Sequence, residues 1–107
     1  MPKSGQYIVV LITAGSRQEA GALARILVSK KLAACSTMMP VRSTFFWKGK
    51  VENARETLII VKTQRKVFPK LERAIRELHS YEVPEIIALP VIAGSAPYLR
   101  WMKEATD

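Results

Sequence analysis

The segment YIVVLIT at residues 7–13 is a continuous apolar run rich in β-branched side chains, and Ala14 and Gly15 follow it. A run of this kind is typical of a strand buried on both faces, so we place it in the middle of a sheet. Ser16 then stands three residues before Glu19, which is the spacing of a capping box at a helix N-terminus. The chain is therefore predicted to begin with a buried strand that leads directly into a helix.

An amphipathic helix and a long hairpin are predicted next. The helix is indicated by apolar residues at helical spacing and by two lysines that suit its C-terminus: Ala20, Leu23, Ala24, Leu27 and Val28, then Lys30 and Lys31. Two β-rich segments, 32–47 and 58–63, flank Gly49 and are expected to pair as an antiparallel hairpin. The polar stretch 52–55 leaves the near part of the second arm uncertain, and Pro40 predicts a bulge or an edge position in the first arm.

The remaining pattern gives a second helix, a last strand and a final helix. Apolar residues at spacings of three and four, with Pro69 in the first turn, predict a helix over about 67–78. A strand is expected over 86–91, and Ser95 with Pro97 opens a short C-terminal helix. The order βαββαβ plus a helix favours an α+β, ferredoxin-like sandwich, with a mixed sheet whose βα units return to parallel neighbours and both helices on one face. We expect one domain over residues 1–107, with residues 1–6 as a flexible tail.

Composition excludes several classes of protein. The 107 residues are 49% hydrophobic and 24% charged, as in a folded globular chain and unlike a disordered one. The longest apolar run is far too short to cross a membrane, and the features of a secretory signal are missing, so we predict no membrane partner and a cytoplasmic location. Cys35 is the one cysteine and cannot form an internal disulfide; we expect it to be buried and its thiol to be inert.

The charge and the motifs argue against nucleic acid and against catalysis. The net charge is +8, and the segment 41–76 holds ten Lys and Arg against three Glu, which could attract phosphates or simply solvate strand and helix faces. The pattern of RNA-recognition domains is not met, because Lys50 and Val51 follow Gly49, and we predict no nucleic-acid partner. The single histidine has no Ser or Cys partner in sequence, so we expect no enzyme.

One short stretch gathers chemically active side chains. LHSYEVP at residues 78–84, with the glutamate after it, brings together His79, Tyr81, Glu82 and Glu85. Imidazole and carboxylate suit borderline ions such as Cu(II) and Zn(II), which makes His79 with Glu82 or Glu85 a candidate metal site. The alternative is that His79 and Glu82 only cap the turn and form hydrogen bonds within it. The sequence leaves both open.

Several motifs together resemble the CutA family of divalent-cation tolerance proteins. They are YIVVLITAGSRQEA, KLAAC, FFWKGKVE, LIIVKTQRKVFPKLE, LHSYEVPEIIALPV and YLRWM, in this order along residues 7–102. The resemblance implies a ferredoxin-like subunit assembled into a homotrimer through its long hairpin strands. It also implies a non-enzymatic role in the response to divalent metal ions such as copper.

The resemblance also points to ligand-binding residues in a cleft between subunits: Trp47, Lys62, Tyr81, Glu85 and Trp101, close to the candidate metal ligands. Ile12 stands where some bacterial members have a cysteine, and Leu78 where they have a second histidine, which disfavours a site for a soft metal ion. A second hypothesis is therefore kept. In it the protein is a trimeric signalling or scaffold module that binds a small anion through Lys62.

Overall fold

The computed structural model describes residues 5–107 and confirms the predicted α+β element order. The elements are β1 (Tyr7–Ala14), α1 (Arg17–Ser29), β2 (Cys35–Trp47), β3 (Lys50–Gln64), a 3-10 turn (Arg65–Val67), α2 (Phe68–Leu78), β4 (Ile86–Pro90) and α3 (Ala96–Thr106). Residues 1–4 of the predicted N-terminal tail lie outside the described residues. Gln6, the last residue of that tail, is bonded to the rest of the fold, because its carbonyl accepts a hydrogen bond of 2.8 Å from the N–H of Arg65.

The four strands form one sheet in the order β2-β3-β1-β4, and every neighbouring pair is antiparallel. The prediction of a mixed sheet was therefore wrong. The two strands of each βαβ unit do run in the same direction, but another strand lies between them: β3 separates β1 from β2, and β1 separates β3 from β4. A helical crossover fixes the direction of the strand that follows it, but another strand can still lie between the two strands that it connects. The sequence pattern did not reveal this insertion.

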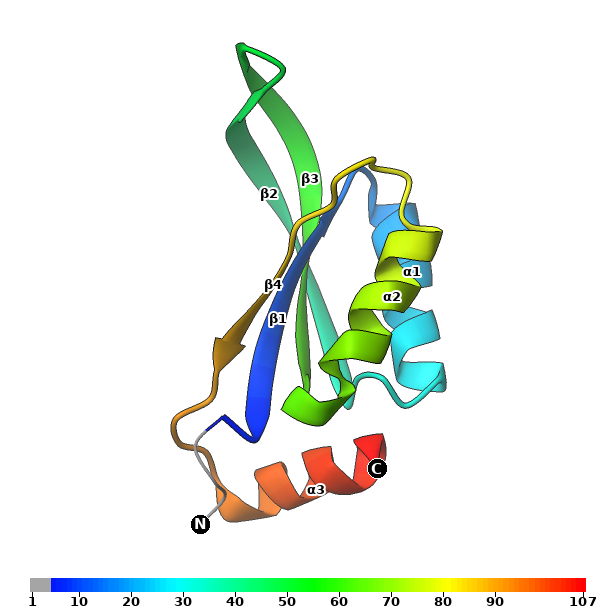
Figure 1. Ribbon diagram of the computed structural model, residues 1–107, viewed down its shortest axis with the longest axis vertical. Coiled ribbons are helices and arrows are strands. Elements are labelled where there is room, and N and C mark those ends of the chain that lie inside the picture. Colours follow the sequence, from blue (N-terminus) through cyan, green and yellow to red (C-terminus); the bar gives the residue numbers. More distant parts are fainter. Residues whose placement is uncertain (1–4) are drawn as a thin grey trace.

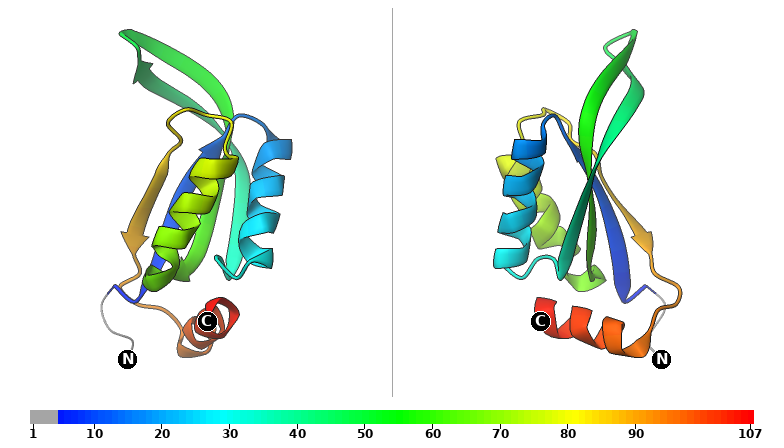
Figure 2. Two further views of the ribbon diagram at one scale, coloured as in Figure 1. Left: turned by 45° about the vertical axis from the view of Figure 1, so that its right-hand side comes forward. Right: turned by 180° about the vertical axis from the view of Figure 1, so that it is seen from behind.

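One face of the sheet is covered by α1 and α2, as both views in Figure 2 show. Alternate strand residues such as Val10, Ile12, Ile59 and Val61 point into this layer and are fully buried. They pack against apolar helix residues: Leu23, Leu27, Leu71 and Ile75. Each such side chain contributes roughly 1.5–3 kcal/mol through removal from water, so this layer is the main core of the subunit.

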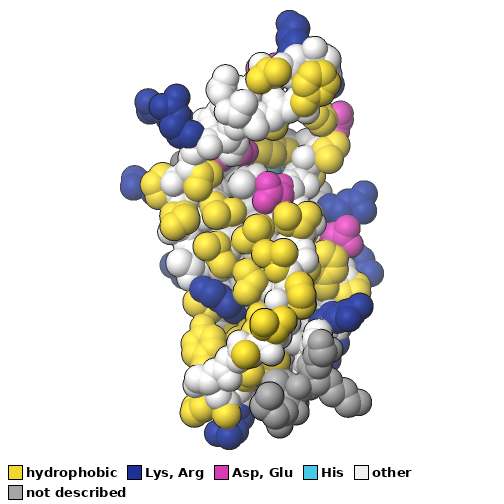
Figure 3. Space-filling model, turned by 90° about the vertical axis from the view of Figure 1, so that its left-hand side faces the viewer, with side chains coloured by type: hydrophobic (Ala, Val, Ile, Leu, Met, Phe, Trp, Pro, Cys, Tyr) yellow, Lys and Arg dark blue, Asp and Glu magenta, His cyan; other side chains and the backbone are white. Residues whose placement is uncertain are grey.

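The other face of the sheet is open and apolar (Figure 3). The strand register places Leu89 beside Val9 and Ile87 beside Leu11, while Ile60 pairs with Leu11 from the other side. Ile87 and Leu89 are 51% and 49% exposed. We call these five residues the open face; soluble monomers rarely leave a contiguous apolar surface of this kind in water.

The β2–β3 hairpin projects beyond the rest of the molecule (Figure 1), which measures 45 × 25 × 22 Å. Its turn uses two residues with positive φ, Lys48 at 50° and Gly49 at 80°, as a tight hairpin turn requires. Pro40 lies on β2, which is an edge strand, and the unbroken register from Cys35 to Trp47 excludes a bulge there. The edge position is thus confirmed, and the uncertain stretch 52–55 belongs to β3.

Helix α3 lies across the end of the sheet opposite the hairpin tip (Figure 1). The buried amide of Gln64 holds it, donating hydrogen bonds to Thr106 Oγ1 at 3.0 Å and to Asp107 Oδ1 at 2.9 Å. Leu99 and Met102 pack beside Tyr7 in a small second core. Within residues 5–107, no helix has both the length and the apolar character needed to span a membrane.

Candidate functional site

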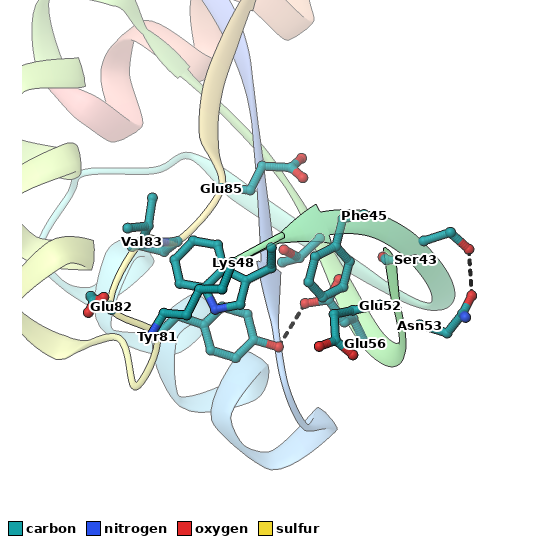
Figure 4. A pocket seen from close by; sticks show the side chains of 14 residues that line it. Ser43, Phe45, Lys48, Glu52, Asn53, Glu56, Tyr81, Glu82, Val83 and Glu85 are labelled. Atoms are coloured by element: carbon teal, nitrogen blue, oxygen red, sulfur yellow. Dashed lines mark hydrogen bonds between the residues drawn. The ribbon is translucent and has the colours of Figure 1, made fainter. Parts of the chain in front are cut away.

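A cavity of about 950 Å³ opens between the projecting part of the hairpin and the loop that follows α2 (Figure 4). The hairpin contributes aromatic and polar side chains, and the loop contributes residues 81–85. The lining residues are Thr13, Ser43, Thr44, Phe45, Trp47, Lys48, Glu52, Asn53, Glu56, Tyr81, Glu82, Val83, Pro84 and Glu85. Three aromatic residues and four glutamates therefore line one space.

His79 fixes the loop from behind the cavity. Its side chain is fully buried, and its ring lies 4.7 Å from that of Tyr81 between centroids. Nε2 lies 2.7 Å from the carbonyl oxygen of Thr13, while Nδ1 lies 3.0 Å from the N–H of Tyr81. A carbonyl can only accept and an N–H can only donate, so the imidazole carries its proton on Nε2 and accepts at Nδ1. Both ring nitrogens are thus used to join the end of β1 to the loop.

Glu19 holds the same loop from α1. Its carboxylate accepts two hydrogen bonds from Ser80, one of 2.8 Å from the N–H and one of 2.9 Å from the hydroxyl. Burial raises the pKa of Glu19, but the two hydrogen bonds from Ser80 outweigh it, so the pKa lies below its ordinary value of 4.5. Ser16 does cap α1, accepting from the N–H of Glu19 at 3.1 Å. The predicted capping box is therefore half formed, because the glutamate side chain is directed to the loop.

Tyr81 connects the loop to the hairpin strand β3. Its hydroxyl donates a hydrogen bond of 2.7 Å to Oε2 of Glu56. Burial, together with the charge and the hydrogen bond of Glu56, raises the pKa of Tyr81 to about 12. The phenol consequently stays a neutral donor at physiological pH, and its ring stays in place as one wall of the cavity.

The cavity is negatively charged although the chain as a whole is basic. Four glutamates line it, at positions 52, 56, 82 and 85, against one ammonium from Lys48. Burial and the charge of Glu56 raise the pKa of Glu85 above its ordinary value of 4.5. Lys48 places its ammonium 5.7 Å from the ring centroid of Trp47, within the range of a cation–π contact.

The structure brings some of the predicted site residues together and separates others. Trp47, Tyr81, Glu82 and Glu85 all line the cavity, whereas the other two ligand-binding candidates do not. Trp101 lies on α3, at the far end from the hairpin tip (Figure 1), with its ring 5.3 Å from that of Tyr98. A cleft that includes Lys62 and Trp101 is therefore not formed within one chain.

Lys62 lies on β3, opposite Cys35 of β2. Its ammonium donates a hydrogen bond of 2.7 Å to Thr37 Oγ1 and lies 3.9 Å from Cys35 Sγ. Cys35 is only half-buried, so the prediction of a buried cysteine was wrong. The sequence pointed to a thiol without a nearby cation, but strand pairing brings in a lysine 27 residues away.

The geometry does not support His79 as a metal ligand. Both of its nitrogens are occupied by backbone partners, so coordination would break one of the two bonds that hold the loop. Across residues 5–107, no three His, Cys, Asp or Glu side chains converge as a metal site requires. The alternative reading of the sequence, in which His79 and Glu82 form hydrogen bonds within the turn, is confirmed for the bond between His79 and Tyr81. The other His79 bond reaches Thr13 of β1, and no side-chain hydrogen bond of Glu82 is found among residues 5–107.

The sequence analysis missed Glu52 and Glu56, which supply half of the carboxylates in the cavity. These residues are four apart on one strand, so their side chains lie on the same face. That spacing is visible in the sequence once 52–55 is assigned to the strand. The contact of Glu56 with Tyr81 joins residues 25 apart, and only the tertiary fold reveals it.

Comparison with known proteins places this chain and its fold in a family. The family model described as "CutA1 divalent ion tolerance protein" matches residues 8–105. The divalent-cation tolerance protein CutA of Thermus thermophilus is 44% identical over 99 residues, which is 92% of this chain and 96% of that protein. Protein CutA of Homo sapiens is 40% identical over 104 residues, but the chain spans only 58% of its length.

Solved structures agree with the sequence comparisons. The structure described as the periplasmic divalent cation tolerance protein CutA from Archaeoglobus fulgidus has a TM-score of 0.93 at 39% identity, covering 94% of this chain and 99% of the other. The structure of CutA1 from Oryza sativa gives the same TM-score at 37% identity, with 97% and 96% of the two chains covered. The chain therefore belongs to the CutA1 divalent ion tolerance protein family.

Proposed function

We propose that the protein acts in tolerance of divalent cations such as copper, as a homotrimer and without enzymatic activity. The match to the Thermus thermophilus relative, whose name states divalent-cation tolerance and nearly all of whose length is covered, carries the proposal. The cytoplasmic location stays a prediction, and relatives are described as periplasmic or chloroplastic.

Two features of the subunit support self-assembly. The open face leaves Ile87 and Leu89 about half exposed, and association would remove this apolar area from water. The predicted ligand-binding residues also divide into two groups, one at the cavity and one, Lys62 with Trp101, outside it. A second copy would have to supply the missing group if these residues act in one cleft.

A metal site in this protein would also draw on more than one copy. The described residues of a single chain hold no three-ligand group, while Glu82 and Glu85 both lie at the exposed rim of the cavity. Carboxylates from one copy, completed by donors from another, would give a borderline ion the three or more ligands that it needs. The ion would then hold the copies together as well as occupy the site.

The test combines sedimentation velocity with calorimetric titration of Cu(II) and Zn(II). We expect a trimer at micromolar concentration, binding of either ion, and weaker binding in Glu85→Gln. His79→Ala should keep its metal affinity if the protein stays folded, since both ring nitrogens are engaged elsewhere. Glu77→Gln, at an exposed position of α2, is the matched control. A monomer that binds neither ion would contradict the proposal.

A second candidate is the anion-binding module centred on Lys62. It is favoured by one observation: within residues 5–107 the Lys62 ammonium contacts a hydroxyl and a thiol, and no carboxylate forms an ion pair with it. A cation without a counter-charge can take an anion. Saturable binding of inorganic phosphate or citrate that is lost in Lys62→Met would support this function, and equal binding by that variant would exclude it.

A further inference from the structure

Glu56 is a buried carboxylate without a counter-charge. The residue is 8% exposed, and the only hydrogen bond that its carboxylate makes within residues 5–107 comes from the neutral phenol of Tyr81. The ion pairs of the described residues do not include it. Buried charges are ordinarily paired, because the removal of an isolated charge from water is strongly unfavourable. An unpaired glutamate lining a cavity therefore calls for a cation in that cavity.

The walls indicate what kind of cation fits. Phe45, Trp47 and Tyr81 present aromatic surface beside the carboxylates. Aromatic faces attract weakly hydrated organic ammonium and guanidinium groups, whereas metal ions need several converging donors, which the described residues do not offer. The Lys48 ammonium, 5.7 Å from the Trp47 ring centroid, already demonstrates the contact within the chain.

The size of the cavity and the charge of the protein also favour an organic cation over a single metal ion. About 950 Å³ is the space of a small-molecule site and far exceeds what a single ion occupies. A chain of net charge +8 repels cations in general, so a cation that binds must do so through a local field. The four lining glutamates supply such a field.

We propose that the cavity binds an organic cation, a diamine or a guanidinium compound, with one charged end near Glu56 and Glu85 and its apolar stem against the aromatic rings. This site does not depend on the divalent-metal role proposed above. Glu56 supplies the buried charge, Tyr81 positions it, and Lys48 competes with the ligand as an internal cation.

The experiment uses 1,4-diaminobutane as the probe and butane-1,4-diol as its uncharged match. Binding is followed by calorimetry, and by Trp47 fluorescence in a Trp101→Phe background. We expect saturable binding of the diamine and none of the diol. Glu56→Gln, which retains an acceptor for Tyr81, should weaken binding about thirtyfold or more. Lys48→Met should tighten it, because the ring is freed and a repelling charge is lost.

Several results would overturn the proposal. The parent protein could show no saturable binding of the diamine at millimolar concentration. Glu56→Gln could bind the diamine as tightly as the parent, or Lys48→Met could bind it more weakly. If Glu56→Gln fails to fold, as judged by circular dichroism, Glu85→Gln takes its place, with Glu77→Gln as control. If a side chain of a second copy fills the cavity, the diamine does not bind, which also refutes the proposal. Cu(II) titration of the same samples tests the metal role separately, so either function can fail alone.

Discussion

At the scale of single residues, the position of Tyr81 depends on the absence of a side chain at Gly15. A Cβ at Gly15 would lie 3.1 Å from the Tyr81 hydroxyl oxygen and 3.4 Å from Cε1. The ring would have to shift by a few tenths of an ångström. The 2.7 Å bond to Glu56 would then lengthen, so two residues from distant segments control one hydrogen bond.

We predict that Gly15→Ala and Tyr81→Phe both destabilise the fold. Tyr81→Phe should cost about 1–3 kcal/mol, because a buried carboxylate loses its hydrogen bond, and Gly15→Ala should cost less, because the bond is strained and not removed. Urea unfolding at a fixed protein concentration measures both. Tyr98→Phe, at a 44% exposed position, serves as control. A Tyr81→Phe protein as stable as the parent would show that the bond contributes nothing.

Glu85 gives a prediction that depends on pH. Its folded-state pKa is raised by burial and by Glu56, so the folded state holds its proton more strongly than the unfolded state does. Stability should therefore fall as the pH rises from below the ordinary value of 4.5 through the folded pKa. Glu85→Gln should raise the melting temperature at pH 7 and change it little at pH 4. A lower melting temperature at pH 7 would contradict the raised pKa.

Glu19 gives a pH dependence of stability with the opposite sign. Its folded-state pKa is lowered, so its bonds to Ser80 contribute stability above pH 4.5, and this contribution is lost as the pH falls through the folded pKa. We expect Glu19→Gln to be less stable than the parent at pH 7 and similar to it at the lowest pH at which the protein stays folded. Thermal denaturation scans at a series of pH values provide the comparison. A pH-independent difference would assign the effect to packing.

At the scale of elements, α1 contains a glycine that packing does not require. Gly21 lies within the helix, and a Cβ built there meets no atom within 4 Å. Alanine restricts the unfolded chain and favours helix, so Gly21→Ala should stabilise the protein by about 0.5–1 kcal/mol. Gly94→Ala is the contrasting variant, because its Cβ would lie 3.0 Å from a methyl carbon of the buried Leu99. Chemical denaturation of the two variants should give opposite signs.

The elements themselves could largely be predicted from local sequence. The apolar run at β1, the cap at Ser16 and the proline at position 69 each act over a few residues, and the structure confirms the strand and helices that they indicate. The antiparallel order of the sheet could not be predicted in this way, because the insertion of β3 beside β1 depends on contacts between distant segments. The assignment of residues 52–55 to the second strand of the hairpin was uncertain, because exposed polar residues give no alternating apolar pattern.

The site could be predicted only in part, for a similar reason. Tyr81 and Glu85 were found because they lie close together in sequence, while Glu56 joins them through a side-chain hydrogen bond between β3 and the loop. His79 was read as a metal ligand from its residue type, but the bond to the Thr13 carbonyl, 66 residues away, occupies it. A side chain's chemistry is visible in the sequence, whereas its partners are set by the fold.

At the scale of the whole molecule, the open face should control assembly. We predict that Ile87→Lys, on β4 beside Leu11 in this face, shifts the proposed trimer toward monomer, because a charge cannot be buried there without a partner. Ile92→Lys is the control, since Ile92 is 90% exposed and follows the last strand. Sedimentation velocity across a concentration series distinguishes the two. A trimer that survives Ile87→Lys would exclude the open face as the contact surface.

The projecting hairpin has a consequence for exchange kinetics. Beyond the sheet, β2 and β3 have only each other as neighbours in the chain, and a two-stranded ribbon in water is marginally stable. The backbone amides around residues 44–53 should thus exchange with deuterium by local opening, far faster than those of β1. If another copy covers the ribbon, this exchange should slow as protein concentration rises, while that of β1 follows global unfolding. Mass spectrometry of hairpin peptides would then report subunit dissociation directly, without a chemical probe attached to the protein.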